Sequence, residues 1–219
     1  MATTAKSSRT TVKRLPEKAR TDIQSLHAVL DAGLVAHVGV VDHGQPIVIP
    51  VGYARDQDKI LIHGSAASRM FKLLESGSPA CITVTILDGL VLARSLFESS
   101  MNYRCAMIFG YATRLSGQPE LDALKVITEH LMPGRWDYAR QPSPKELKAT
   151  MTLSLPLTEF SIKISEGPPD DSEGDLESDA GRAIWAGHIP IHEQLGVPIP
   201  DQFVPQGTPL PNYVTAWTR

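Results

Sequence analysis

Residues 34–63 constrain the fold of this chain more than any other segment. Three stretches rich in β-branched residues, 34–41, 46–55 and 59–63, are separated by the short turn sequences Asp42-His43-Gly44 and Asp56-Gln57-Asp58. Strands joined by connections this short run antiparallel, because parallel strands need a crossover of a dozen residues or more. The segment therefore predicts an antiparallel meander.

The rest of the chain adds further strands and a few helices. Strands are predicted at 80–87, at 90–95 after a break at Asp88-Gly89, at 102–113, at 160–164 and at 183–191. Helices are predicted from Thr21, with Gln24 completing a capping box, to Gly33, and at 67–76, 120–130 and 145–150. Six or seven strands with two or three inserted helices indicate a mainly β fold, a small and partly open barrel.

The predicted barrel domain covers residues 21–191. Residues 1–20 are rich in Thr, Ser, Lys and Arg, with Glu17 as their one acid, and predict a flexible arm rather than a mitochondrial transit peptide. An acidic linker, 167–181, has two prolines and then six acids before any base, and it is expected to be solvated or mobile. Residues 192–219, rich in proline, predict an irregular tail lying on the body or on a partner subunit.

Composition narrows the classes of partner. A net charge of -3 gives no general attraction to nucleic acid or to an anionic membrane, and no apolar run is long enough to span a bilayer. The two cysteines, Cys81 and Cys105, lie in apolar strand-like runs, as expected of reduced thiols in a cytoplasmic protein.

The strongest candidate site follows the third strand of the meander. A strand ends at His63, Gly64 follows, and a helix begins, so unpaired N–H groups of the first turn can bind an anion. The hydroxyls, guanidinium and ammonium group that could hold a phosphate there belong to Ser65, Ser68, Arg69 and Lys72. A capped helix with a surface arginine explains the same residues equally well.

Three further groups of residues could contact a ligand. Ile49, Pro50, Val51, Gly52 and Tyr53 form a strand against which a planar ring could lie, although a strand bulge is the simpler interpretation. Asn102, Tyr103 and Arg104 place polar groups at the start of another strand, where they could face a ligand or pair with nearby acids such as Glu98. Trp185 could cover a ring or close a dimer interface, but a core position is favoured.

Several common chemistries are missing. The chain has no GxGxxG, GxxxxGK[ST], HExxH, CxxC or GxSxG sequence, so no Rossmann dinucleotide site, P-loop, nucleophile elbow or metal site is predicted. His63 could act as an acid, a base or a haem ligand, although a hydrogen-bonded supporting histidine is favoured. The candidates for groups near a reacting atom are Tyr103, Arg104 and His63.

Blocks of the sequence resemble a known family when taken in order. These blocks are 63–70 (HGSAASRM), 87–95 (LDGLVLARS), 101–104 (MNYR) and 185–187 (WAG). Over about residues 11–191 the chain is similar to the pyridoxamine 5′-phosphate oxidase-like FMN-binding split barrels, in the flavin-nucleotide-binding or nitroimidazole-reductase-like branch. The resemblance implies a six-stranded split barrel and a homodimer with two FMN sites at its interface. It maps the phosphate-binding Ser-Arg pair onto Ser68 and Arg69, with Met70 where a basic residue often follows.

The resemblance implies an FMN-dependent oxidoreductase that passes electrons from NADH or NADPH to a small acceptor such as a quinone or a nitro compound. True pyridoxamine 5′-phosphate oxidase activity is not expected. Residues 46–55 lack the paired Arg and Lys of those oxidases, and His188 and Ile189 stand near the position of their substrate-reading arginine. The alternatives are a flavin or haem carrier without turnover and a deazaflavin (F420)-dependent reductase.

Overall fold

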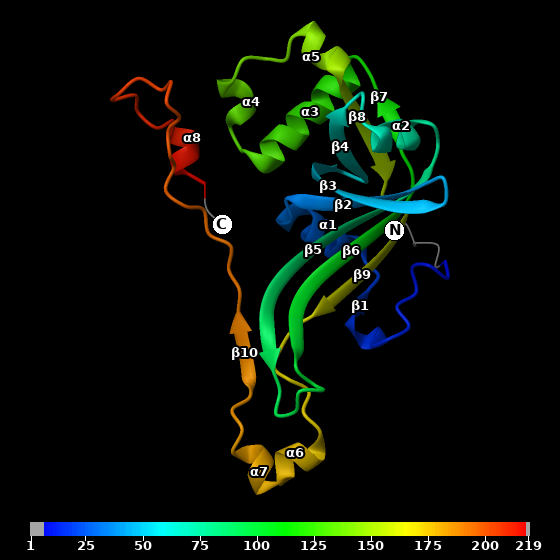
Figure 1. Ribbon diagram of the computed structural model, residues 1–219, viewed down its shortest axis with the longest axis vertical. Helices are drawn as coiled ribbons and strands as arrows, with labels where there is room; N and C mark the ends of the chain where they lie inside the picture. The colour runs from blue at the N-terminus through cyan, green and yellow to red at the C-terminus, as the bar shows by residue number, and fades with distance from the viewer. Residues whose placement is uncertain (1–6, 218–219) are drawn as a thin grey trace.

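One antiparallel strand path accounts for most of the computed structural model, which describes residues 7–217 (Figure 1). The strands are β1 (Ala19–Arg20), β2 (Val35–Asp42), β3 (Gln45–Asp56), β4 (Lys59–Ser65), β5 (Pro79–Leu92), β6 (Ser100–Tyr111), β7 (Thr113–Leu115), β8 (Thr150–Pro156), β9 (Glu159–Ser165) and β10 (Gly187–Pro190). The helices are η1 (Pro16–Lys18), α1 (Ile23–Ala32), α2 (Arg69–Glu75), α3 (Gln118–Leu131), α4 (Arg135–Tyr138), α5 (Pro144–Ala149), α6 (Glu173–Glu177), α7 (Asp179–Arg182) and α8 (Asn212–Thr215). The mainly β class and the β2–β3–β4 meander are confirmed.

The strand path closes on itself. Its order is β1-β9-β6-β5-β2-β3-β4-β8-β7, and β7 follows β6 after the single residue Ala112. The path that leaves β6 through β5 therefore returns to the same stretch of chain through β8. Six strands, β2 to β6 and β8, enclose one core. The described residues hold ten strands because β7 prolongs β6, because β9 pairs with β6 and adds Phe160 and Ile162 to the core, and because β1 and β10 pair with β9 and β5.

Apolar side chains that point inward from the strands fill the ring. Tyr53, Ile82 and Ile108 are fully buried there, and Leu26 and Leu30 of α1 join the same cluster. The first helix begins one residue later than predicted, because its N-cap is Asp22, whose carboxylate accepts a hydrogen bond from the Ser25 amide at 2.7 Å. The predicted capping box of Thr21 and Gln24 is therefore wrong, while the helix ends at Gly33 as expected.

Strand β8 is absent from the sequence-based predictions, although residues 151–155 alternate apolar and small polar side chains. Its outward Thr152 and Ser154 are buried as well as its inward residues. This burial arises because helices α3 and α5 pack against β8. The hydroxyls therefore lie under a helical layer instead of marking a solvated face.

Strand β5 runs without interruption through the predicted break. The pairing with β6 shifts register between Leu87 and Gly89, so Asp88 forms a bulge. A Cβ on Gly89 would lie 2.8 Å from the carbonyl oxygen of Ile189 in β10. Glycine at this position thus admits a tenth strand beside β5 and does not end it.

Helix α3 covers the outer faces of β3 and β4. Its buried Ala123 and Ile127 pack with Ala54 of β3 and Leu61 of β4 in a second, smaller apolar cluster. Helices α4 and α5 follow α3 along the chain and lie beside it (Figure 1). The sequence predicted α3 and α5 in type and approximate extent.

The described part of the N-terminal arm is attached to the barrel. Arg9 pairs with Glu159 of β9 at 2.9 Å, the Lys163 ammonium donates to the Arg14 carbonyl, and β1 pairs with β9. Residues 1–6 of the predicted flexible arm lie outside the described residues. The remainder of the arm thus follows the strand that borders β6.

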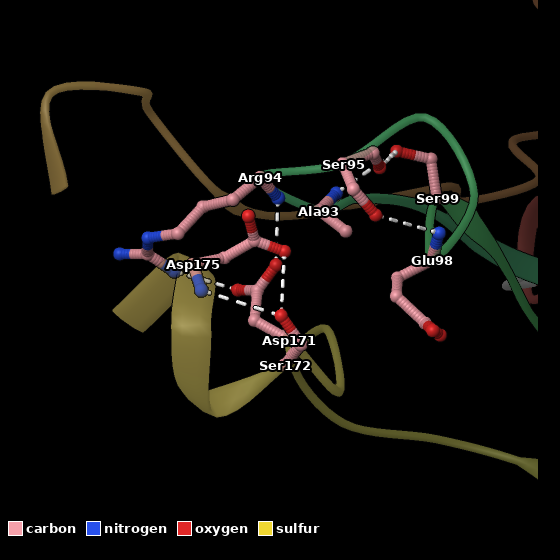
Figure 2. Close-up of polar contacts among 8 residues, drawn as sticks. All are labelled: Ala93, Arg94, Ser95, Glu98, Ser99, Asp171, Ser172 and Asp175. Atoms are coloured by element: carbon pink, nitrogen blue, oxygen red, sulfur yellow. Dashed lines mark hydrogen bonds and ion pairs between the residues drawn. The ribbon is translucent and has the colours of Figure 1, made fainter. Parts of the chain in front are cut away.

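The acidic segment 167–181 is ordered by one buried ion pair and two short helices, α6 and α7. The Asp171 carboxylate is 3% exposed and accepts hydrogen bonds from the Arg94 amide at 2.7 Å and from the Arg94 guanidinium at 2.6 Å (Figure 2). Four of the six acids of the segment, Asp170, Glu173, Glu177 and Asp179, are exposed to solvent, as expected, whereas the Asp171 carboxylate is buried. This segment is fixed to the loop between β5 and β6.

The C-terminal tail is extended, and both of its ends are hydrogen-bonded to the rest of the protein. Strand β10 pairs with β5, and the Trp217 indole N–H donates to the Pro133 carbonyl at 2.8 Å. Residues 191–211 have neither helix nor strand. The Ile191 amide still donates to the Asp88 carbonyl of β5 at 2.9 Å, and the chain beyond it runs beside the barrel (Figure 1). Val197, Ile199 and Phe203 are more than 80% exposed there. Apart from the short helix α8, the backbone of the tail is irregular.

Candidate functional site

The predicted phosphate site lies at the start of α2. Ser68 is the N-cap in extended conformation, and its hydroxyl makes no capping hydrogen bond. The Ser65 hydroxyl accepts a hydrogen bond from the Ala67 amide at 3.2 Å, and the Ser68 amide donates to the Ser65 carbonyl at 2.9 Å. Gly64 is required because a Cβ there would lie 2.4 Å from the Phe71 ring. The strand-to-helix turn therefore leaves the Ser68 hydroxyl for a ligand.

Arg69 has a partner that the sequence analysis missed. One guanidinium nitrogen lies 3.2 Å from a carboxylate oxygen of Asp42, whose side chain is only 9% exposed. The other Asp42 oxygen lies 2.7 Å from His43 Nδ1. Arg69 itself is 73% exposed and Lys72 lies exposed one turn further on, so both cations can meet an anion from solution. A phosphate at this corner must share Arg69 with Asp42.

The β3 segment offers a surface only in part. Ile49 and Pro50 are exposed, and Val51 and Gly52 are partly exposed. Tyr53 lies in the core, where its hydroxyl donates to the Leu30 carbonyl at 2.7 Å. Its side chain therefore cannot face a ligand. A Cβ on Gly52 would lie 3.0 Å from Leu131, so packing of α3 explains this glycine without a bound ring.

Two of the three polar residues at the start of β6 form hydrogen bonds within the chain. Asn102 donates to the Gly167 carbonyl at 2.9 Å and is buried. Arg104 forms two hydrogen bonds with Asp88, at 2.9 and 2.7 Å, and the pKa of its guanidinium is raised chiefly by this pair. Tyr103 is partly exposed. Asn102 therefore holds the segment that follows β9, and Arg104 holds the β5 bulge.

Trp185 is not a core residue. It is 67% exposed, and its ring lies over the backbone of Gly187, where a Cβ would approach it to 3.0 Å. The favoured interpretation of Trp185 as a core side chain is wrong. The interpretation as a cover for a ring, or as part of an interface, stays a prediction.

The predicted site residues form two separate groups in one chain. Helix α2 contacts β2 and β7, near the end of β6, whereas Asn102 and Arg104 lie near the start of β6. The strand between Asn102 and Thr113 spans roughly 35 Å at about 3.3 Å per residue. Arg69 and Arg104 therefore lie near opposite ends of β6.

His63 points away from the barrel core, toward helices α3, α4 and α5. Its Nδ1 is buried and has no hydrogen-bond partner among residues 7–217, and burial lowers the pKa of the imidazole. It lines a cavity of about 410 Å³ together with residues of the helical layer, namely Leu124, Thr128, Trp136, Ala139, Arg140, Gln141, Pro142, Glu146, Leu147 and Thr150. None of these partners was predicted, because they lie about 60 to 90 positions further along the chain.

Within the described part of the chain, no group of three or more His, Cys, Asp or Glu side chains could hold a metal ion. No helix there is long and apolar enough to cross a membrane.

Comparison with known proteins identifies the family. The family model described as pyridoxamine 5′-phosphate oxidase matches residues 22–164, and the chain belongs to this family. The chain is 38% identical to the FAD and heme binding protein from Mycobacterium smegmatis, with 92% of this chain and 97% of that chain covered and a TM-score of 0.87. It is 39% identical to the flavocytochrome Anf3 from Azotobacter vinelandii, with 95% and 96% covered and a TM-score of 0.88.

A third solved structure supports the fold alone. This protein from Bacteroides thetaiotaomicron, described as a candidate 5-nitroimidazole antibiotic resistance protein, is 20% identical, with 67% of this chain and 86% of that chain covered and a TM-score of 0.57. A search of curated proteins finds no match.

Proposed function

We propose that this chain is a flavin-binding redox protein that holds a flavin phosphate at the start of α2. The observation that carries the proposal is the similarity, over more than 90% of both chains, to two proteins whose descriptions name FAD or a flavocytochrome. The Arg69 guanidinium, the Ser68 hydroxyl and the first-turn amides of α2 are the groups that would bind the phosphate. FAD is the expected flavin rather than FMN, because the M. smegmatis relative is described as binding FAD.

The proposed reaction passes electrons from NADH or NADPH to a small acceptor such as a quinone or a nitro compound. A bound flavin supplies the hydride chemistry. The chain's contribution is to fix the phosphate at α2 and to offer the exposed Ile49 and Pro50 of β3 as a surface for the ring.

We also propose a homodimer with the flavin sites at its interface. Support comes from the separation of the two groups of site residues within one chain and from the apolar tail. Val197, Ile199 and Phe203 would be covered if a second copy lay beside the extended segment. The second copy could then place its residues 102–104 or its Trp185 beside the candidate phosphate site at the start of α2.

The test of flavin binding is the absorbance of the purified full-length protein. We expect a yellow protein that releases FAD on heating, identified by chromatography against FMN and deazaflavin standards. Release of FMN would retain the flavin proposal and correct the identity of the flavin. A colourless protein that binds neither added FAD nor added FMN would refute the proposal. Steady-state turnover with NADH or NADPH and a quinone or nitro acceptor then separates an enzyme from a flavin carrier.

A second proposed cofactor is haem. The description of the M. smegmatis relative names heme together with FAD. The observation on this chain that favours it is that His63 lines a cavity together with the apolar Leu124, Trp136 and Leu147. A Soret band in the purified protein, or after addition of hemin, tests this second cofactor independently of the flavin.

A further inference from the structure

A cavity of about 570 Å³ lies between the C-terminal tail and the last turn of α3, and neither cofactor proposal uses it. Leu34, just before β2, and Leu131, at the end of α3, form its apolar barrel side. The volume falls within the usual range of small-molecule sites. The cavity is therefore large enough for a ring system of ordinary size.

The tail closes the outer side of this cavity with two aromatic rings. Tyr213 and Trp217 both line it, and their ring centroids are 5.7 Å apart. The Trp217 indole N–H donates to the Pro133 carbonyl at 2.8 Å. The Tyr213 side chain lies over Gly134, where a Cβ would come within 2.7 Å of it. Because these contacts hold the tail against the turn after α3, the two rings offer a fixed stacking surface to a planar molecule.

His130 brings an imidazole to the same cavity. Its Nε2 lies 2.7 Å from the Gly33 carbonyl oxygen. Since a carbonyl oxygen can only accept, Nε2 carries the hydrogen, and the neutral ring keeps a lone pair on Nδ1. Nδ1 has no hydrogen-bond partner among residues 7–217, and it is not one of the buried unpartnered atoms of these residues. It is therefore an accessible acceptor for a ligand that carries a hydroxyl group.

The other polar groups beside the cavity have partners within the chain. The Tyr213 hydroxyl accepts a hydrogen bond from Arg135 at 3.1 Å, and the Gly134 amide donates to the Glu129 carboxylate at 2.7 Å. No Lys, Arg, Asp or Glu side chain of the described residues lines the cavity. Because a charge buried without a partner costs much free energy, an uncharged ligand suits these walls.

We propose that this cavity binds a small, uncharged aromatic molecule with a hydroxyl group, in the chemical class of phenols and hydroquinones. The ring would lie against Tyr213 and Trp217, and its hydroxyl would donate to Nδ1 of His130. Binding itself does not require a flavin. The relevance of a hydroquinone rests on the proposed function, in which NADH or NADPH and a proton reduce a quinone to the hydroquinone.

The cavity lies beside the strand surface proposed for the flavin ring. Leu131 lines the cavity and also packs on Gly52 of β3, where a Cβ would come within 3.0 Å of it. Gly52 is two residues from Pro50, which corresponds to about 7 Å along a strand. A hydroquinone bound in the cavity would therefore lie near the place where the proposed reaction forms it.

The experiment measures the binding of 1,4-dihydroxynaphthalene, kept reduced under argon, by isothermal titration calorimetry of the full-length protein as purified and again after FAD is added. The matched ligand is 1,4-dimethoxynaphthalene, which keeps the ring but cannot donate a hydrogen bond. Wild type should bind the dihydroxy compound about three- to tenfold more tightly, the range expected for one neutral hydrogen bond. In His130→Phe this preference should vanish, because the acceptor is lost while an aromatic ring is retained.

Two further variants test the location of the site. Trp217→Ala removes part of the aromatic wall and should weaken the binding of both ligands about two- to tenfold, the range expected for one aromatic contact. His188→Phe changes an exposed histidine of β10 and should leave both affinities unchanged. Circular dichroism verifies that the three variants are folded.

Each failure has a distinct meaning. Absence of binding by wild type, or unchanged affinities in Trp217→Ala, would refute the site. Equal binding of the two ligands by wild type, or a preference that survives in His130→Phe, would refute the role of His130. If added FAD displaced the dihydroxynaphthalene, the flavin itself would occupy the cavity and the assignment would be wrong. A protein that binds no flavin but shows the expected ligand preference would refute the proposed function and support this site.

Discussion

The ion pair between Arg69 and Asp42 allows the proposed flavin phosphate site to be tested by one substitution that weakens flavin binding and another that strengthens it. In the free protein the guanidinium lies 3.2 Å from the buried Asp42 carboxylate, with His43 on the opposite oxygen. Binding of a phosphate would draw Arg69 partly away from this carboxylate. Removing Arg69 should therefore weaken flavin binding, whereas neutralising Asp42 should strengthen it.

The magnitudes follow from the exposure of the pair. Charge-assisted hydrogen bonds contribute about 1.5–3 kcal/mol, while an exposed ion pair such as that of Arg69 is worth at most about 1 kcal/mol. Their difference is about 0.5–2 kcal/mol, and its middle corresponds to a rise of about tenfold in the dissociation constant for flavin in Arg69→Ala. Asp42→Asn removes the competing charge and should lower the constant by up to about fivefold.

The assay is titration of the flavin-free protein with FAD and with FMN, followed by quenching of flavin fluorescence. Arg114→Ala is the matched control, because Arg114 pairs with Glu75 at the far end of α2 at 2.6 Å. It should leave the flavin affinity unchanged. Unaltered affinity in Arg69→Ala would place the phosphate elsewhere, and weaker binding by Asp42→Asn would refute the competition between carboxylate and phosphate.

Three further predictions concern the scaffold. Asp171→Ala leaves the Arg94 amide and guanidinium without their partner and should speed proteolysis within residues 167–182 about tenfold or more. Gly64→Ala places a Cβ 2.4 Å from the Phe71 ring and should lower the free energy of unfolding by about 1–3 kcal/mol in urea titrations. Burial raises the pKa of the Cys105 thiol, so iodoacetamide at pH 8 should modify it at least about tenfold more slowly in native than in unfolded protein.

Nearby residues supply the controls for these three predictions. Asp170→Ala changes the exposed neighbour of the buried acid and should leave proteolysis unchanged. Gly174→Ala meets no atom within 4 Å and should not destabilise the protein. Equal cleavage of both aspartate variants, unchanged unfolding of Gly64→Ala, or equal alkylation of Cys105 in native and unfolded protein would contradict the respective arguments.

Local patterns in the sequence were enough to predict much of the barrel. The runs of β-branched residues in 34–63 and the short Asp42-His43-Gly44 turn predicted β2, β3 and β4, since strand propensity and turn chemistry are properties of a few neighbouring residues. The same local logic was insufficient at Gly89. A glycine within a strand can end it or make room for another chain segment, and only the pairing of β10 with β5 shows which of these applies.

The candidate site also has a part that the sequence predicted and a part that only the tertiary structure shows. The strand-to-helix turn of the candidate phosphate site could be predicted because His63, Ser65, Ser68 and Arg69 lie in one short stretch of the chain, and a helix start presents its amides whatever the rest of the fold. The partnership of Arg69 with Asp42 and the cavity beside His63 depend on which strands and helices pack together. The sequence by itself therefore determined the β-rich architecture and the strand-to-helix turn of the candidate phosphate site, because these follow from short-range backbone and side-chain chemistry. Only the tertiary structure decided their partners, since β-pairing and helix packing join residues tens of positions apart.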